Sequence, residues 1–174
     1  MRHGVRVGVD VGKARIGLAR SDPHGMLATP VETVNRDHSG SLDVARIAAV
    51  VAELDAIEVV VGLPLALSGN RTASTTDAVG FAEVLARSLA VPVRLVDERL
   101  STVAAQSVLR AAGRKAKTQK PVVDQVAAVI ILQHALDSER TQGTPAGTAV
   151  DLGPDSLPAA TPPAGAPPEG QPQR

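Results

Sequence analysis

One short apolar run near the start of the chain carries an acid in its interior. In residues 5–12, four valines alternate with Arg6, Gly8, Asp10 and Gly12, so a β-strand here places every valine on one face and Asp10 on the other. Asp is uncommon in strands, and a carboxylate buried without a partner is costly. The flanking glycines leave space that a hydrated cation or a phosphate could enter. An edge-strand Asp that faces water is the simpler interpretation, but two acids later in the chain weigh against it.

The composition restricts the class of protein. The 174 residues allow one domain with a core, plus some extra sequence. The chain has no cysteine, as in a reducing cytosol, and charges interrupt its start, unlike a signal peptide, so we expect a cytoplasmic protein. No apolar run is long enough to span a membrane. One Phe without Trp or Tyr leaves an aliphatic core and disfavours single-strand binding by base stacking.

The spacing of apolar residues predicts an α/β protein with the element order β-β-β-α-β-α-β-α-α. Short links between the three strands in residues 5–36 favour an antiparallel meander. Later strands are expected at 57–61 and 93–96, and helices at 42–54, 75–89, 102–112 and 122–137. Right-handed crossovers then give a mixed five-stranded sheet, in which the first strand pairs with the second and with strand 57–61.

The last part of the chain differs in composition from the rest. Residues 141–174 hold eight of the 13 prolines, together with many Gly, Ala, Ser and Thr. Such a segment cannot bury enough apolar surface to offset the entropy lost on ordering. We therefore expect a folded domain over residues 1–140 and a disordered tail over residues 141–174.

Three acids are expected to meet at one edge of the sheet. Asp10 lies near the carboxyl end of its strand and Glu98 at the carboxyl end of another, where ligands of such sheets collect. Asp124 lies in the first turns of the last helix, on an apolar face that should pack on the sheet. Each acid alone has an ordinary explanation, as a solvated side chain or a complement to the helix dipole. Together they would repel one another without a hard cation, so we predict that Asp10, Glu98 and Asp124 bind Mg²⁺ or Mn²⁺ and catalyse phosphodiester cleavage.

A run of cations precedes Asp124 in the sequence. Five of the 11 residues from 110 to 120 are basic, with no acid between them and Asp124. A solvated basic loop is the ordinary interpretation, but beside a metal site such a loop neutralises the phosphates that flank the scissile one. The expected partner is a nucleic acid, bound by a monomer or a homodimer. The predicted nucleic-acid-binding residues are Lys13, Arg15, Arg99, Arg110, Arg114, Lys115, Lys117 and Lys120.

Four segments resemble the YqgF/RuvX family of bacterial RNase H-like proteins, in the order of that family. They are Gly8–Ala19 with Ser21-Asp22, Val60–Leu65 with Gly69, Val96–Thr102, and Asp124–Leu132. The resemblance spans about residues 5–138, and the Asp-Glu-Arg-Leu-Ser-Thr run is its most specific part. It implies an RNase H-like fold and a divalent-metal nuclease whose acids are Asp10, Glu98 and Asp124. Family members are described as nucleases that mature the 5′ end of pre-16S rRNA, and also as Holliday junction resolvases, by likeness to RuvC.

The chain departs from the RuvC-type pattern at one position, and several alternative functions stay open. RuvC-type resolvases have an acid at the end of the fourth strand, where this chain has Gly62-Leu63-Pro64. Glu98, or else Asp97, must then supply the third ligand, and the number of metal ions is undecided. A nucleic-acid-binding factor without catalysis is a second function. An ATPase module is a third, because the Asp10–Gly12 turn also resembles a phosphate loop of actin-like proteins and sugar kinases. An RNA substrate is preferred to a DNA junction on the family description alone.

Overall fold

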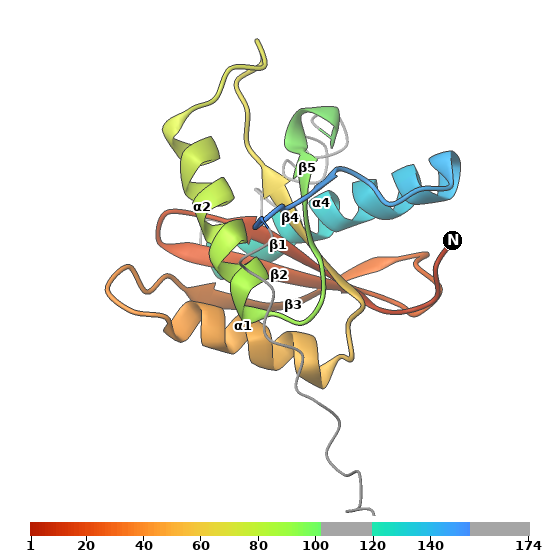
Figure 1. Cartoon of the computed structure of the whole chain (residues 1–174), viewed down its shortest axis with the longest axis horizontal. Helices are drawn as coiled ribbons and strands as arrows, with labels where there is room; N and C mark the ends of the chain where they lie inside the picture. The colour runs from red at the N-terminus through yellow and green to blue at the C-terminus, as the bar shows by residue number, and fades with distance from the viewer. Residues whose placement is uncertain (102–119, 154–174) are drawn as a thin grey trace, which may run out of the picture.

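One mixed β-sheet runs through the protein, with helices on both of its faces (Figure 1). The computed structural model describes residues 1–101 and 120–153. The first three strands are antiparallel neighbours, β4 and β5 run parallel to β1, and a short β6 is antiparallel to β5. The predicted meander, and the pairing of the first strand with the second and with the strand near Ile57, are confirmed. In sheet order the strands are β3 (Ala28–Asn35), β2 (Arg15–Ser21), β1 (Arg6–Val11), β4 (Glu58–Leu63), β5 (Val93–Asp97) and β6 (Thr148–Ala149).

The described helices divide between the two faces of the sheet. Helices α1 (Leu42–Glu53) and α2 (Ala73–Ser88) lie in front of the sheet in Figure 1, and the long α4 (Lys120–Gln142) crosses behind it. A short 3₁₀ turn, η1 (Glu98–Ser101), follows β5. The helix expected over residues 102–112 lies outside the described residues. Among the described helices, none combines the length and the hydropathy needed to cross a membrane.

Strand β1 separates two cores, as its alternating sequence predicts. Val7 and Val9 are fully buried in the core beneath α1 and α2. Gly8 faces the opposite way, because a Cβ on it would lie 2.7 Å from Cβ of Leu132 in α4. Asp10 follows Gly8 by two residues, so its side chain also projects from the α4 face of the sheet.

The folded part continues beyond Arg140, where the sequence places the start of the tail. Helix α4 extends to Gln142, and β6 adds a sixth strand to the sheet, so the expected count of five was wrong. The glycines at 143 and 147 adopt φ of 74° and 70°, which a glycine permits at little cost and which lets the chain turn back to the sheet edge. Arg94 of β5 holds that turn through bonds of 2.7 Å to the carbonyl oxygens of Ala146 and Gly147. Disorder of the tail remains a prediction, because residues 154–174 lie outside the described residues.

Candidate active site

Asp10 lies near the carboxyl end of β1, directly opposite Gly17 of β2. Two effects raise the pKa of Asp10 to about 6, namely burial of its carboxyl group and, to a smaller extent, the negative charge of Asp124. A carboxylate with these surroundings favours any cation that can reach it, because the protein leaves its charge poorly compensated. Asp10 is therefore the centre of the candidate site.

Asp124 reaches this site because glycines in the sheet let α4 approach closely. A Cβ on Gly17 would collide with the backbone carbonyl of Asp124, and one on Gly8 would lie 2.9 Å from the carbonyl oxygen of Ala128. Helix and sheet therefore meet with backbone against backbone, which is the packing that interior strand glycines permit. The sequence analysis missed this role of Gly17, although a glycine inside a strand is the signal that could have indicated it.

Glu98 arrives from the other side of β1, at the first residue of η1 after β5. Its pKa is raised to about 7, first by burial, then by the charges of Asp10 and Asp97. One of its carboxylate oxygens lies against Gly62 of β4, in the volume that a Cβ there would fill. The structure thus brings both Glu98 and Asp124 within electrostatic reach of Asp10.

Asp97 and Glu98 are adjacent in sequence but have different surroundings. Nε of Arg99 donates to both carboxylate oxygens of Asp97 at 3.1 Å, Nη2 donates to Oδ2 at 2.6 Å, and the Arg99 amide donates to Oδ1 at 2.9 Å. These bonds lower the pKa of Asp97, whereas that of Glu98 is raised. The charge of Asp97 is therefore already compensated, and the geometry favours Glu98 over Asp97 as the third acid of the site.

The three acids do not form a closed metal-binding group in this structure. Within the described residues, no set of three or more His, Asp or Glu side chains is arranged to hold a metal ion. Asp124 instead accepts a hydrogen bond of 2.9 Å from Nε of Arg15, so that guanidinium partly compensates the negative charge of Asp124. The chemistry of the donors still fits a hard divalent cation, because all three are carboxylates and two have raised pKa values. A cation bound by all three would therefore compete with Arg15 for the charge of Asp124.

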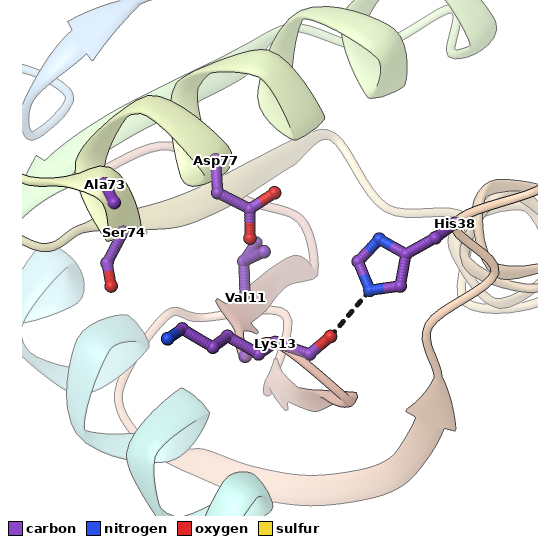
Figure 2. Close-up of a pocket in the computed structure, with 7 residues that line it drawn as sticks. Val11, Lys13, His38, Ala73, Ser74 and Asp77 are labelled. Atoms are coloured by element: carbon purple, nitrogen blue, oxygen red, sulfur yellow. Dashed lines mark hydrogen bonds between the residues drawn. The ribbon is translucent and has the colours of Figure 1, made fainter.

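A pocket of about 420 Å³ opens one residue beyond Asp10, between the β1–β2 turn and the start of α2 (Figure 2). The ring of His38 is held there, with Nε2 2.7 Å from the carbonyl oxygen of Lys13. Asp77 makes two bonds of 2.9 and 3.0 Å to Arg36, so its charge is compensated. The exposed Lys13 side chain is the cationic group that this pocket presents at the sheet edge. The sequence analysis assigned no role to His38, whose contact with Lys13 links two loops that are distant in sequence.

The predicted nucleic-acid-binding residues have different positions in the structure. Lys13 lines the pocket, Arg15 pairs with Asp124 of the candidate site, and Arg99 pairs with Asp97 beside it. Lys120 is the first residue of α4. Nothing in the described residues tests the basic loop, because Arg110, Arg114, Lys115 and Lys117 lie outside them and so does the side chain of Lys120.

Comparison with known proteins identifies relatives over most of the chain. Residues 4–138 match a family model described as "RuvX: Holliday junction resolvase". A protein of Clavibacter michiganensis named "Putative pre-16S rRNA nuclease" is 69% identical, over 86% of this chain and 93% of the relative. A protein of Leifsonia xyli with the same name is 59% identical, over 88% of this chain and all of the relative.

Solved structures support the fold. The chain is similar to Thermus thermophilus RuvC in complex with a Holliday junction substrate, with a TM-score of 0.54, 24% identity, and coverage of 85% of this chain and 100% of that one. Another structure of Thermus thermophilus RuvC gives a TM-score of 0.51 at 22% identity, over 84% of this chain and 99% of that one. Likeness at this identity speaks for the fold alone, and it confirms the predicted RNase H-like class.

The family follows from the sequence matches rather than from the fold. The family model spans most of the chain, and the two relatives are well above half identical along nearly their whole length. These matches confirm the predicted family and the assignment to nucleases, which are hydrolases of phosphodiester bonds. The chain belongs to the RuvX family.

Proposed function

We propose that this protein is a divalent-metal-dependent endonuclease that matures the 5′ end of pre-16S rRNA in the cytoplasm. The observation that carries the proposal is the convergence of Asp10, Glu98 and Asp124 from three separate segments, with two of the three pKa values raised. Buried acids whose pKa is raised destabilise the fold unless a cation compensates their charge, so Asp10 and Glu98 together favour a catalytic function. The names of the relatives from Clavibacter and Leifsonia support the choice of substrate.

The three carboxylates would hold Mg²⁺ or Mn²⁺ at the carboxyl ends of β1 and β5. Bound there, such an ion supplies Lewis-acid stabilisation of the charge that develops at the scissile phosphodiester. Asp10 provides the central anionic oxygens, on a rigid strand between the other two acids. Glu98 and Asp124 bring their oxygens from opposite sides, and the surrounding apolar packing of Ile131 and Ala128 keeps the helix carrying Asp124 in place.

The substrate strand would be held by cations around the sheet edge. Lys13 lines the pocket next to β1, and Arg15, the first residue of β2, pairs with Asp124. Arg15 becomes available for a phosphate when Asp124 turns to a metal ion. The basic residues between 110 and 120 would extend this surface along the strand. Contacts of this kind go to phosphates, so the sequence or shape of the RNA must be selected by other groups.

The experiment that tests the proposal compares two substrates under the same conditions. We expect the purified protein to cleave a transcript that carries the pre-16S leader in Mg²⁺ or Mn²⁺, to leave it intact in EDTA, and to leave a four-way DNA junction uncut. Symmetric cleavage of the junction would instead identify a resolvase, which must act as a dimer. Binding that persists in EDTA, with no cleavage in either ion, would show a binding factor without catalysis.

Arg15 provides a second test, because it competes with a cation for Asp124. Replacement of Arg15 by Gln removes a positive charge 2.9 Å from the Asp124 carboxylate. We expect the affinity for Mn²⁺, measured by calorimetry, to rise about three- to tenfold. Affinity for RNA should fall, and its dependence on salt should weaken by about one unit of log–log slope.

Arg15→Lys is the matched control for this test. It keeps the charge, so its affinity for Mn²⁺ should stay near that of the wild type. A loss of Mn²⁺ affinity in Arg15→Gln would contradict the expectation, because Arg15 would then be needed to hold Asp124 ready for the ion.

A further inference from the structure

Gly62 lies inside β4, where a side chain would block the candidate site. It pairs with Val96 of β5 and follows Val61, the partner of Val9 in β1. Position 62 is therefore next to Asp10 across the β1–β4 pairing. A Cβ on Gly62 would overlap Oε1 of Glu98, lie 3.1 Å from its Cδ, and lie 2.6 Å from Cδ1 of Ile131. The Glu98 carboxylate thus occupies the volume of the missing side chain.

The backbone conformation of Gly62 does not itself require glycine. Gly62 is not among the described glycines with positive φ, and it pairs with Val96 in the ordinary parallel register of β4 and β5. Glycine weakens a strand interior, where a β-branched residue packs better. What the position requires is therefore the absence of a side chain, and the group that uses the space is the carboxylate of Glu98.

The order of the strands explains why Glu98 needs that space. Glu98 follows β5, which is separated from β1 by β4. Neighbouring strands lie about 4.8 Å apart, so Glu98 starts roughly 10 Å from the strand of Asp10. Its side chain must cross β4 to approach Asp10, and it crosses at the one residue of β4 that has no side chain. A glutamate has the length for this crossing.

We propose that Gly62 is a positioning residue, whose missing side chain lets Glu98 place its carboxylate beside Asp10. It follows that a side chain at position 62 or one at position 98 can place a carboxylate in the same volume. An aspartate at 62 starts only one strand away from Asp10, so a shorter side chain can deliver its oxygens to the same volume. This inference rests on the proposed function, because it assumes that the carboxylate serves to bind a cation.

The first experiment is a double-mutant cycle on affinity for Mn²⁺, measured by calorimetry. Gly62→Ala should lower the affinity at least tenfold, because the new methyl group displaces the Glu98 carboxylate. Glu98→Ala should lower it by a similar factor. The double variant should be no weaker than Glu98→Ala alone, since the methyl group then has no carboxylate left to displace. Additive losses would overturn the proposal, because Gly62 would then act independently of Glu98.

Gly80→Ala is the matched control for the glycine substitution. Gly80 lies inside α2, and a Cβ there meets nothing within 4 Å. This variant should bind Mn²⁺ as the wild type does. Circular dichroism would establish whether each variant folds, since a methyl group at 62 also approaches Ile131.

The decisive variant relocates the carboxylate. Gly62→Asp combined with Glu98→Ala should restore Mn²⁺ affinity to within about threefold of the wild type, and recover cleavage. In this variant the Glu98 carboxylate no longer occupies the space at position 62, so folding requires only that the end of the Ile131 side chain move aside. A folded variant that binds Mn²⁺ no better than Glu98→Ala would overturn the proposal. A wild-type protein that binds no Mn²⁺ would instead refute the proposed metal-dependent function, and this inference with it.

Discussion

Replacement of Asp10 by asparagine is expected to reduce cleavage of the RNA substrate by at least about a thousandfold. Asp10 is the acid on which the other two converge, and the loss of a central ligand removes several kcal/mol of transition-state stabilisation. Asparagine has nearly the same shape, so binding of the RNA through its phosphates should persist. The measurements are single-turnover cleavage in Mg²⁺ and RNA binding by anisotropy.

The same variant should be more stable than the wild type when metal is absent. The pKa of Asp10 is about 6 in the folded protein and 3.8 in a model compound. Because the folded-state pKa is raised, the ionised Asp10 carboxylate destabilises the fold. This destabilisation is absent below pH 3.8, grows as pH rises, and is complete above pH 6. At pH 8 in EDTA, Asp10→Asn should therefore gain about 1–3 kcal/mol of unfolding free energy. The gain should disappear near pH 4.

A matched acid on α4 serves as the control for both effects. Asp137 is half-exposed and pairs with Arg140 on the same helix, far along α4 from Asp124. Asp137→Asn should leave cleavage and stability unchanged within about 0.5 kcal/mol. Undiminished metal-dependent cleavage by Asp10→Asn would contradict the catalytic assignment. An unchanged melting temperature at pH 8 would show that the Asp10 carboxylate is well solvated.

The sequence predicts which face of β1 and which face of α4 carry the acids, but it does not predict the contacts that these acids make. The alternation of Val7, Gly8, Val9 and Asp10 determines which side of β1 the acid occupies, because successive strand residues point to opposite faces. Helical spacing similarly places Asp124 on the buried side of α4. Neither pattern indicates how closely α4 approaches the sheet, because that approach depends on Gly17, which lies in a different strand. The pairing of Arg15 with Asp124 likewise joins residues 109 positions apart.

The missed sixth strand has a physical explanation in its length and composition. Two residues, Thr148 and Ala149, form β6, and they lie in a segment rich in Gly and Pro that predicts disorder. Their order comes from partners elsewhere in the chain. Arg94 binds the preceding carbonyls, and Val150 donates its amide to the carbonyl of Val93. A two-residue strand held by distant side chains leaves no local periodicity to detect.

Replacement of Glu139 by glutamine should cause the largest loss of stability among the substitutions considered. Glu139 lies near the end of α4, at the opposite end of the sheet from the candidate site, and is only 4% exposed. It accepts a bond of 2.9 Å from Nε of Arg2 and faces Nη2 of Arg6 at 3.3 Å, while Arg2 also binds Glu58 at 3.1 Å. These four residues span 137 positions of sequence, so no local pattern predicts their contact.

The loss of stability follows from the positive charge of Arg6, which remains buried without a carboxylate partner. Arg6 is 1% exposed and has no other carboxylate among its hydrogen-bond partners in the described residues. Removing one partner of a buried ion pair costs about 3–5 kcal/mol, a large part of the 5–15 kcal/mol of a typical domain. We expect the melting temperature at pH 7 to fall by roughly 10 °C. Glu53→Gln is the matched control, because Glu53 is exposed and its pair with Arg46 is longer, at 3.6 Å.

The dependence on pH gives this prediction a signature that a general packing defect lacks. Hydrogen bonds from Arg2 chiefly lower the pKa of Glu139 to about 2, from 4.5 in a model compound. A lowered folded-state pKa means that the stabilisation is complete above pH 4.5 and is lost as pH falls towards 2, by about 3 kcal/mol. The difference in unfolding free energy between wild type and Glu139→Gln should therefore narrow between pH 5 and pH 2. A difference that stays constant over this range would mean that the charge of Glu139 contributes little, and that its shape alone holds α4 against the sheet.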